Sequence, residues 1–361
     1  MARGERYAPG EVPGLDEGDL DLLRRLIRAR GPSGAEGEVR DLCREVLAPL
    51  ADTIEVDPAG NLVCLIRAGR EGRDPIVVAP HLDEIAMQVK RVEEDGTLSV
   101  VALGGVRPMS FGQCAVDVIG DGEILRGAFS LGSLHRSGSD PQMSHIRAEG
   151  PGWDDVFVMT GLSRAAVEAV GVHAGSFVVI SAEERHVVEI GDCLGAHFMD
   201  DRALILAGVL ALRTIKARRE ALDRDLYFVL TVQEEVTNAG ALYAAHTLPG
   251  TEMLALEVGP VAREYGTRLS ADPIVSIGDQ KGLYSPEMTA DLRRAIEAAG
   301  YRPQVALLDG FLSDASAVGA TGLRPRTAVI GLPTQNTHGF EVIDKGGIEA
   351  VARSLERFLL G

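Results

Sequence analysis

Within residues 227–240, an apolar run stops abruptly at two adjacent carboxylates, Glu234 and Glu235. The run is rich in β-branched, aromatic and leucine residues, which predicts a buried strand of an α/β sheet. In such a sheet, ligands bind beyond the carboxyl ends of the strands. Two buried carboxylates there need a cation or a proton to compensate them. Glu235 could then bind a metal and Glu234 could transfer a proton; the alternative is a solvated pair that opens a loop.

Length and hydropathy bound the architecture. The chain has 361 residues, of which 45% are hydrophobic, so it can bury a large core and is long enough for two domains or for one domain with an insertion. It contains no apolar run approaching the roughly 20 residues that cross a bilayer, and its first 14 residues have no apolar leader region. We therefore expect a cytoplasmic protein with no membrane partner.

Charge and cysteine content argue against further classes of function. The chain has 36 basic and 53 acidic residues and a net charge of −17, which disfavours binding to nucleic acid or to an anionic membrane surface. The four cysteines lack the CxxC spacing of a zinc site or a disulfide framework. We expect them to be buried free thiols: Cys43, Cys64, Cys114 and Cys193.

The first part of the chain has an α/β pattern. Leucines and isoleucines at helical spacing from Leu20 predict a helix that ends at Gly31-Pro32. Ser33 and Glu36 fit a capping box that opens a second helix, over 36–50. Three strands follow, over 53–57, 61–66 and 75–79, and the third runs into His81-Leu82-Asp83-Glu84.

The pattern changes near residue 88 to short strands separated by glycine turns. Strands are expected at 97–103, 115–119, 123–128, 156–159 and 177–180, with almost no helix except 163–170, and Trp153 is expected to anchor packing. We therefore predict that a small β-rich domain, residues 88–189, is inserted into a catalytic domain made of residues 1–87 and 190–361.

The α/β pattern returns after residue 190. Further strands are predicted over 226–232, 253–257, 304–308 and 326–331, and helices over 203–217, 239–246, 286–299 and 345–360. Asp200 and Asp201 stand at a helix start, where capping alone could explain them. One of the two could instead bridge two cations, because a carboxylate has two oxygens.

A set of metal-competent residues follows the predicted strands. His81 and Asp83 come directly after one strand, and residues i and i+2 of a strand share a face, so Asp83 can fix the tautomer of His81 for metal binding. Glu257 ends a second strand and His338 follows a third. Taken singly, each could be a solvent-facing polar residue.

Together these residues form an inventory of two imidazoles and three or four carboxylates, without thiolate. This inventory suits zinc, cobalt or manganese better than calcium. It leaves Glu234 free as a base beside a two-metal site.

Five ordered motifs resemble the tetrahedral and glutamyl aminopeptidase family of dinuclear metallopeptidases. They are HLDE (81–84), MDDR (199–202), VQEEV (232–236), LEVG (256–259) and PTQNTHGFEVID (333–344). Residues 57–61 and 155–180 also resemble this family, so the similarity covers nearly the whole chain. Each motif is short, but their order and spacing are specific.

The resemblance implies a role for each candidate residue. Five residues would hold two divalent metal ions: Asp200 as the bridge, His81 and Glu257 at one ion, and Glu235 and His338 at the other. Glu234 would be the general base, and Asp83 would support His81. The family pattern alone favours Asp200 over Asp201 as the bridge.

The resemblance also implies the architecture and the partners. It implies a phosphorylase- or hydrolase-like mixed-sheet catalytic domain with an inserted barrel-like domain used in assembly. The expected assembly is a homo-oligomer, for example a dodecamer, that takes peptides as substrates. Zinc is the expected metal, with cobalt or manganese as alternatives.

The chain departs from the family pattern at three places. Glu257 stands where Asp is usual, which adds one methylene and could change the occupancy of that metal site. Gly339-Phe340 replaces Ser-Pro, and Ser313-Asp314 replaces Thr-Asp. These changes bear on substrate preference more than on the metal scaffold.

The expected reaction is hydrolysis of an N-terminal peptide bond by water activated between two metal ions, with Glu234 as the base. One alternative is a dinuclear N-acyl-amino-acid amidohydrolase that uses the same residues; another is a catalytically impaired peptide-binding scaffold. A phosphoesterase is disfavoured because no phosphate-binding glycine loop is present. Asp314 is expected to cap a helix, and the remaining histidines are expected to be structural or surface residues: His135, His145, His173, His186, His197 and His246.

Overall fold

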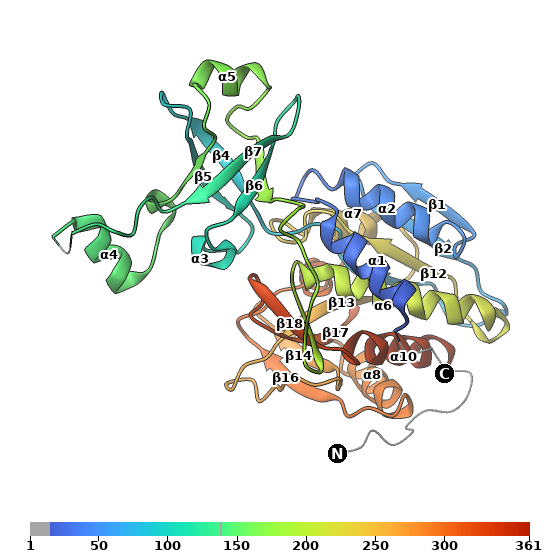
Figure 1. Cartoon of the computed structure of the whole chain (residues 1–361). Helices are drawn as coiled ribbons and strands as arrows, with labels where there is room; N and C mark the ends of the chain where they lie inside the picture. The colour runs from blue at the N-terminus through green and yellow to red at the C-terminus, as the bar shows by residue number, and fades with distance from the viewer. Residues whose placement is uncertain (1–14, 138) are drawn as a thin grey trace.

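The apolar runs pair into one large mixed sheet, which is the base of the α/β part of the molecule (Figure 1). The computed structural model describes residues 15–137 and 139–361. Residues 1–14, whose glycines and prolines without periodicity predict a loose arm, lie outside them. The main path of the sheet runs in the order β1 (Thr53–Val56), β2 (Leu62–Ile66), β12 (Leu226–Leu230), β3 (Ile76–Ala79), β13 (Glu252–Pro260), β17 (Arg326–Gln335), β18 (Phe340–Asp344), β11 (Cys193–His197) and β10 (Val188–Ile190).

The four central strands, β12, β3, β13 and β17, are parallel to one another. Their carboxyl ends therefore meet at one edge of the sheet. The flanking strands β2 and β18 pair antiparallel to this centre. A side branch leaves β17 and contains β14 (Ile274–Asp279), β15 (Gly282–Leu283) and β16 (Gln304–Leu308).

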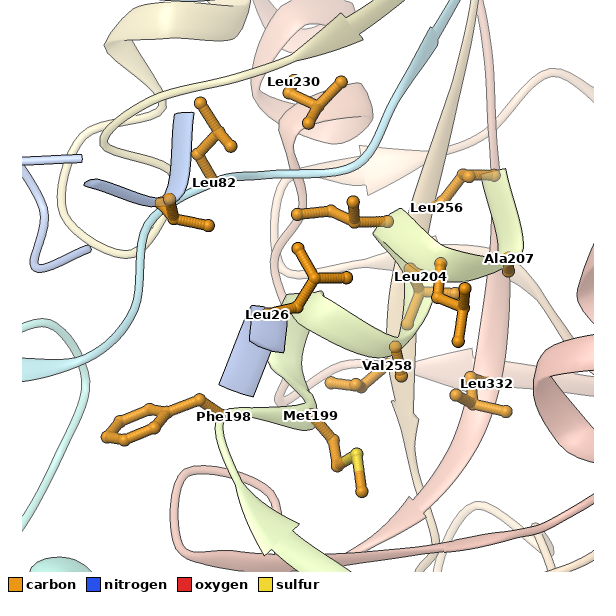
Figure 2. Packing of buried hydrophobic residues seen from close by; sticks show 14 of the residues in the cluster. Leu26, Leu82, Phe198, Met199, Leu204, Ala207, Leu230, Leu256, Val258 and Leu332 are labelled. Atoms are coloured by element: carbon orange, nitrogen blue, oxygen red, sulfur yellow. The ribbon is translucent and has the colours of Figure 1, made fainter. Parts of the chain in front are cut away.

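Helix α6 (Met199–Ala217) is the most buried helix of this body. Its apolar residues extend around most of its circumference, as expected for a helix covered on both sides. It packs against β13 of the sheet and against the helices α1 (Glu17–Arg28) and α10 (Gly347–Leu360). In Figure 2, Leu204 of α6 lies among Leu26 of α1 and the strand residues Leu256 and Leu332. The other helices are α2 (Gly37–Leu47), α7 (Ala239–Thr247), α8 (Pro286–Ala298) and α9 (Asp314–Thr321), with a 3-10 turn at Arg219–Ala221.

The second body is a closed barrel that stands to one side of the α/β body (Figure 1). Its strands are ordered β4 (Ala86–Val92), β5 (Leu98–Leu103), β8 (Phe157–Met159), β7 (Leu125–Ser130), β6 (Ala115–Ile119) and β9 (Phe177–Ile180). Trp153, in a 3-10 turn (Trp153–Asp155), packs against Phe111 and Phe129 with ring centroids 6.5 and 6.4 Å away. The expected packing role of Trp153 is confirmed.

The predicted fold class is confirmed: a mixed α/β sheet carries a small barrel. The barrel strands lie between residues 86 and 180, and the domain limits at 87/88 and 189/190 stay predictions. The expectation that residues 163–170 would hold almost all the helix of this region was wrong. Besides α5 (Arg164–Ala169), it contains α3 (Pro108–Phe111) and α4 (Pro141–Glu149). The first is only four residues long and the second is mostly polar, so neither shows helical periodicity.

The predicted capping box at Ser33 was also wrong. Helix α2 begins at Gly37 after the N-cap residue Glu36, which makes no side-chain cap bond. Ser33 instead donates its hydroxyl to Asp83 Oδ2 at 2.6 Å. A buried carboxylate far along the chain attracts this hydroxyl more strongly than the local helix end does.

The four cysteines are free, as predicted; Cys43 and Cys64 are buried, while Cys114 and Cys193 are half-buried. Burial raises the pKa of the Cys43 and Cys64 thiols to about 12. Within residues 15–137 and 139–361, no helix combines the length and the apolar character needed to cross a bilayer.

Candidate metal centre

The carboxyl edge of the central strands gathers the predicted residues. His81 follows β3, Glu234 and Glu235 follow β12, and His338 lies between β17 and β18. Glu257 lies inside β13, because pairing with β17 continues to Pro260; the predicted strand end at Glu257 was therefore wrong.

Two of these side chains join two aspartates from the start of α6 in a first buried group of possible metal ligands: His81, Glu257, Asp200 and Asp201. One ligand atom of each lies within 4.8 Å of those of the others. His81 Nε2 is 2.9 Å from Asp200 Oδ1 and 3.9 Å from Glu257 Oε2. Asp201 Oδ2 accepts the backbone N–H of His81 at 3.1 Å.

A second group joins Asp200 to Glu235 and His338. His338 Nε2 is 3.3 Å from Glu235 Oε2 and 3.6 Å from Asp200 Oδ2. Asp200 therefore belongs to both groups and turns one oxygen toward each imidazole, whereas Asp201 belongs to the first group only. Such a carboxylate has the geometry of a bridge between two cations.

Both imidazoles present the same nitrogen to the carboxylates. Nδ1 of His81 lies 3.1 Å from the carbonyl oxygen of Asp83, and Nδ1 of His338 lies 2.8 Å from that of Gly105. A backbone carbonyl can only accept a hydrogen bond, so Nδ1 of each ring carries an N–H, and Nε2 is the nitrogen that would face a cation. A ligating histidine is commonly fixed in this way.

The Asp83 carboxylate lies behind the acidic pair. Its Oδ1 is 3.6 Å from His81 Nδ1, whereas the main-chain oxygen of Asp83 is 3.1 Å from that nitrogen. Its closer partners are the backbone N–H groups of Glu234 and Glu235, at 2.9 and 3.1 Å. Asp83 thus fixes the chain that carries both glutamates as well as facing the imidazole.

The electrostatics of the edge favour a bound cation. Burial, followed by repulsion from neighbouring carboxylates, raises the pKa of Glu235 and of Glu257 well above the ordinary value, although His81 opposes this shift. Burial lowers the pKa of His81, but Asp200 and Asp83 outweigh it and raise this pKa well above its usual range.

Two buried carboxylate oxygens support the same conclusion. Glu235 Oε1 and Asp201 Oδ1 have no hydrogen-bond partner among the described residues. An orphaned buried carboxylate oxygen is costly unless a cation or a proton meets it. Oxygen and imidazole donors at this spacing fit a divalent transition metal.

One carboxylate that contacts the candidate ligands was not identified from the sequence. Glu341, on β18, accepts the backbone N–H of His338 at 2.9 Å and that of Asp200 at 3.0 Å, so it ties two candidate ligands together. Burial and the nearby Asp200 raise its pKa to about 8. The spacing in the sequence could have indicated this role, because Glu341 lies two residues before Ile343 and both side chains are on the buried face of β18.

The prediction for Asp314 was wrong. The N-cap residue of α9 is Ser313, whereas Asp314 is buried and accepts hydrogen bonds from Thr231 and Asn238. The six histidines expected to be structural lie outside both groups of possible ligands. His197 packs edge-on against Phe340, with ring centroids 5.5 Å apart.

A cavity of about 710 Å³ opens onto this edge. It is lined by Asp200, Glu234, Glu235, Glu257 and His338 and by an outer wall that includes Val261, Tyr265 and Phe311. A second cavity, of about 650 Å³, lies where β13 and β17 begin, at Glu252 and Arg326, and contains no histidine.

A mixed α/β sheet that carries a small barrel is the fold of solved aminopeptidases, so the chain falls in the class of α/β peptide hydrolases. The sequence model of the M42 glutamyl aminopeptidase family matches residues 60–353, and the chain belongs to this family.

Individual relatives agree with this assignment. A putative aminopeptidase of Acetivibrio thermocellus is 25% identical over 331 residues, which cover 90% of this chain and 93% of that protein. Aminopeptidase APDkam598 from the archaeon Desulfurococcus kamchatkensis has a TM-score of 0.84 at 26% identity, covering 95% of this chain and 94% of its own. The Pyrococcus horikoshii TET1 peptidase has a TM-score of 0.82 at 22% identity, with 95% and 99% covered.

Proposed function

We propose that this protein is a metal-dependent aminopeptidase that removes N-terminal residues from peptides. One observation carries the proposal: in a chain of the M42 family, Asp200 turns one carboxylate oxygen toward His81 and the other toward His338. A site in which one carboxylate can serve two cations is suited to hydrolysis with two metal ions.

The residues of the edge divide between two ions in this proposal. His81 and Glu257 would hold one ion, Glu235 and His338 would hold the other, and Asp200 would contribute one oxygen to each. Zinc is the proposed metal, with cobalt or manganese as alternatives. When bound, the ions lower the pKa of the attacking water and polarise the scissile carbonyl group.

Glu234 handles the protons. Burial raises the pKa of the Glu234 carboxyl well above the ordinary value; His81 opposes this shift, and Asp314 and Glu235 add to it. Glu234 lines the same cavity as Asp200 and His338. It takes a proton from the attacking water and later gives it to the nitrogen of the leaving amine. Asp83 holds the backbone of Glu234 and Glu235 and keeps His81 oriented.

The proposal also accounts for selection of a free N-terminus. Two divalent ions would offset the charge of the carboxylates, so the α-amine of a substrate would be recognised as a neutral donor that could complete the coordination of one ion.

We further propose that the protein is a cytoplasmic homo-oligomer. Support comes from the TET1 peptidase of Pyrococcus horikoshii, which can assemble into a tetrahedron or a large octahedral shell.

The experiment compares aminoacyl-anilides with N-acylated amino acids, before and after removal of metal by a chelator. The proposal predicts release from free-amine substrates that stops on chelation and returns with zinc, cobalt or manganese. If only N-acylated substrates are cleaved, the protein is a deacylase and the aminopeptidase proposal is wrong. If the metal-loaded protein cleaves neither class of substrate, a peptide-binding scaffold is favoured.

A further inference from the structure

Asn238 occupies an unusual place behind the acidic pair. It precedes α7 as the N-cap residue, in the left-handed region with φ of 54° and ψ of 23°. Asparagine adopts this conformation more readily than most residues. An asparagine at a helix start commonly uses its side-chain oxygen to cap the helix, but Asn238 makes no such bond. Its side chain is therefore available for another purpose.

The side-chain amide of Asn238 connects two carboxylates. Nδ2 lies 2.9 Å from Glu234 Oε1 and 3.1 Å from Asp314 Oδ1. An NH₂ group has two hydrogens, and the two carboxylates use both. One oxygen of Glu234 is thereby fixed, while the other is left for proton transfer.

Asp314 is itself anchored from a second direction. Thr231, the residue after β12, donates its hydroxyl to Asp314 Oδ2 at 2.5 Å. Asp314 is 1% exposed and Asn238 is 6% exposed, so water competes little for these bonds. The end of β12, the start of α7 and the start of α9 thus converge on the Glu234 carboxylate.

Neither Asn238 nor Asp314 lines the cavity, whereas Glu234 does. We infer that Asn238 and Asp314 are positioning residues that hold the Glu234 carboxylate in the orientation required for proton transfer. The inference rests on the proposed role of Glu234 as the base. A long side chain such as glutamate needs such support, because a displacement of about 1 Å can cost roughly 100-fold in rate.

The test is a double-mutant cycle between Asn238→Ala and Glu234→Gln, in which kcat, KM and metal content are measured for each protein. Asn238→Ala should lower kcat roughly 10- to 100-fold, with the metal content retained and KM changed by less than about threefold. In the Glu234→Gln background it should cause no further loss, because the carboxylate that it positions is already gone. Asp314→Asn, which keeps the size of the side chain, should lower kcat in the same non-additive way.

A matched control separates positioning from general support of the loop. Asn61 is buried and also bonds this segment, since it accepts the N–H of Val232 and donates to the carbonyl of Gly240, but it does not bond Glu234. Asn61→Ala should lower the melting temperature, and any change that it makes in kcat should be equal in both backgrounds.

The outcomes distinguish this inference from the proposed function. Wild-type kcat in Asn238→Ala and Asp314→Asn, with Glu234→Gln inactive, would overturn the positioning role and leave Glu234 as the base. Losses that multiply in the double mutant would also overturn it, in favour of a structural role. Normal turnover in Glu234→Gln would instead reject Glu234 as the base, and the inference with it.

Discussion

Glu234 and Glu235 are adjacent in the sequence, but their side chains have different partners. Glu235 Oε2 lies 3.3 Å from His338 Nε2, among the candidate ligands. Glu234 Oε1 accepts the amide of Asn238 instead. This division is the structural reason for giving the two carboxylates different roles.

A conservative change at Glu234 tests this division. Glu234→Gln keeps the shape and the bond from Asn238 but cannot accept a proton, so kcat should fall by roughly 10² to 10⁴ while the metal content stays at the wild-type value. Steady-state kinetics and elemental analysis of the same preparation measure both quantities. Loss of metal in this variant would place Glu234 among the ligands instead.

The individual residues of the centre were partly predictable. His81, Glu235 and His338 follow apolar runs, and the carboxyl ends of parallel strands meet at one edge, so their approach could be expected. Glu341 and Asn238 were missed because each joins a partner three or four residues away to another more than 70 residues away in the chain, and spacing does not reveal the distant partner.

At the scale of elements, the contact between α6 and β12 depends on the absence of one side chain. A Cβ atom added at Gly208 of α6 would lie 2.2 Å from Cζ of Phe228 on β12. The glycine therefore allows the most buried helix to reach the strand that carries the acidic pair.

Gly208→Ala should destabilise the protein even though alanine favours a helix. Overpacking typically costs about 1–3 kcal/mol, which outweighs the roughly 1 kcal/mol gained in helix propensity. Thermal unfolding measures the difference. Gly37→Ala is the control, because its nearest neighbour is the end of Arg40 at 3.9 Å, and it should leave the Tm unchanged or slightly raised. An equal or higher Tm for Gly208→Ala would contradict this packing.

A buried ion network joins the metal-site loop to other elements. Glu84 pairs with Arg185, after the barrel, at 2.7 Å and with Arg202 of α6 at 2.8 Å, and all three side chains are fully buried. Arg202 also donates to the carbonyl of Leu82. The loop that carries His81 is thereby connected to both the barrel and α6.

Glu84→Gln should be strongly destabilising, because it leaves two buried guanidinium groups without their charge partner. Breaking a buried ion pair from one side costs about 3–5 kcal/mol. The exposed pair of Arg164 and Glu94 gives the control, and Glu94→Gln should leave the Tm unchanged. Similar Tm values for the two variants would show that the Glu84 network contributes no more than a surface pair.

At the scale of the whole molecule, the sequence predicted the fold class better than its boundaries. The apolar runs of β3, β12, β13 and β17 identified the centre of the sheet, because parallel strands buried on both faces lack polar residues. The pairings of β10, β11 and β18 were not predicted, since these short strands mix polar and apolar residues. Closure of the barrel depends on long-range pairing between β4 and β9, which periodicity alone does not show.

The proposed assembly makes a prediction about mass. A chain of 38.3 kDa that assembles as a closed shell should elute at a fixed multiple of this value, near twelve-fold for a dodecamer. Light scattering after size-exclusion chromatography gives the mass without a shape assumption. A single species of one chain mass at micromolar concentration would contradict the homo-oligomer.

One edge of the sheet is proposed to hold two metal ions that share Asp200. Elemental analysis gives the number of metal ions per chain, in the wild type and in Glu235→Ala and Asp200→Ala variants shown to be folded. We expect near two ions in the wild type, near one in Glu235→Ala and almost none in Asp200→Ala. A shared ligand is ruled out if Asp200→Ala retains two ions, and a two-metal site is ruled out if the wild type stays substoichiometric with zinc, cobalt and manganese supplied in turn.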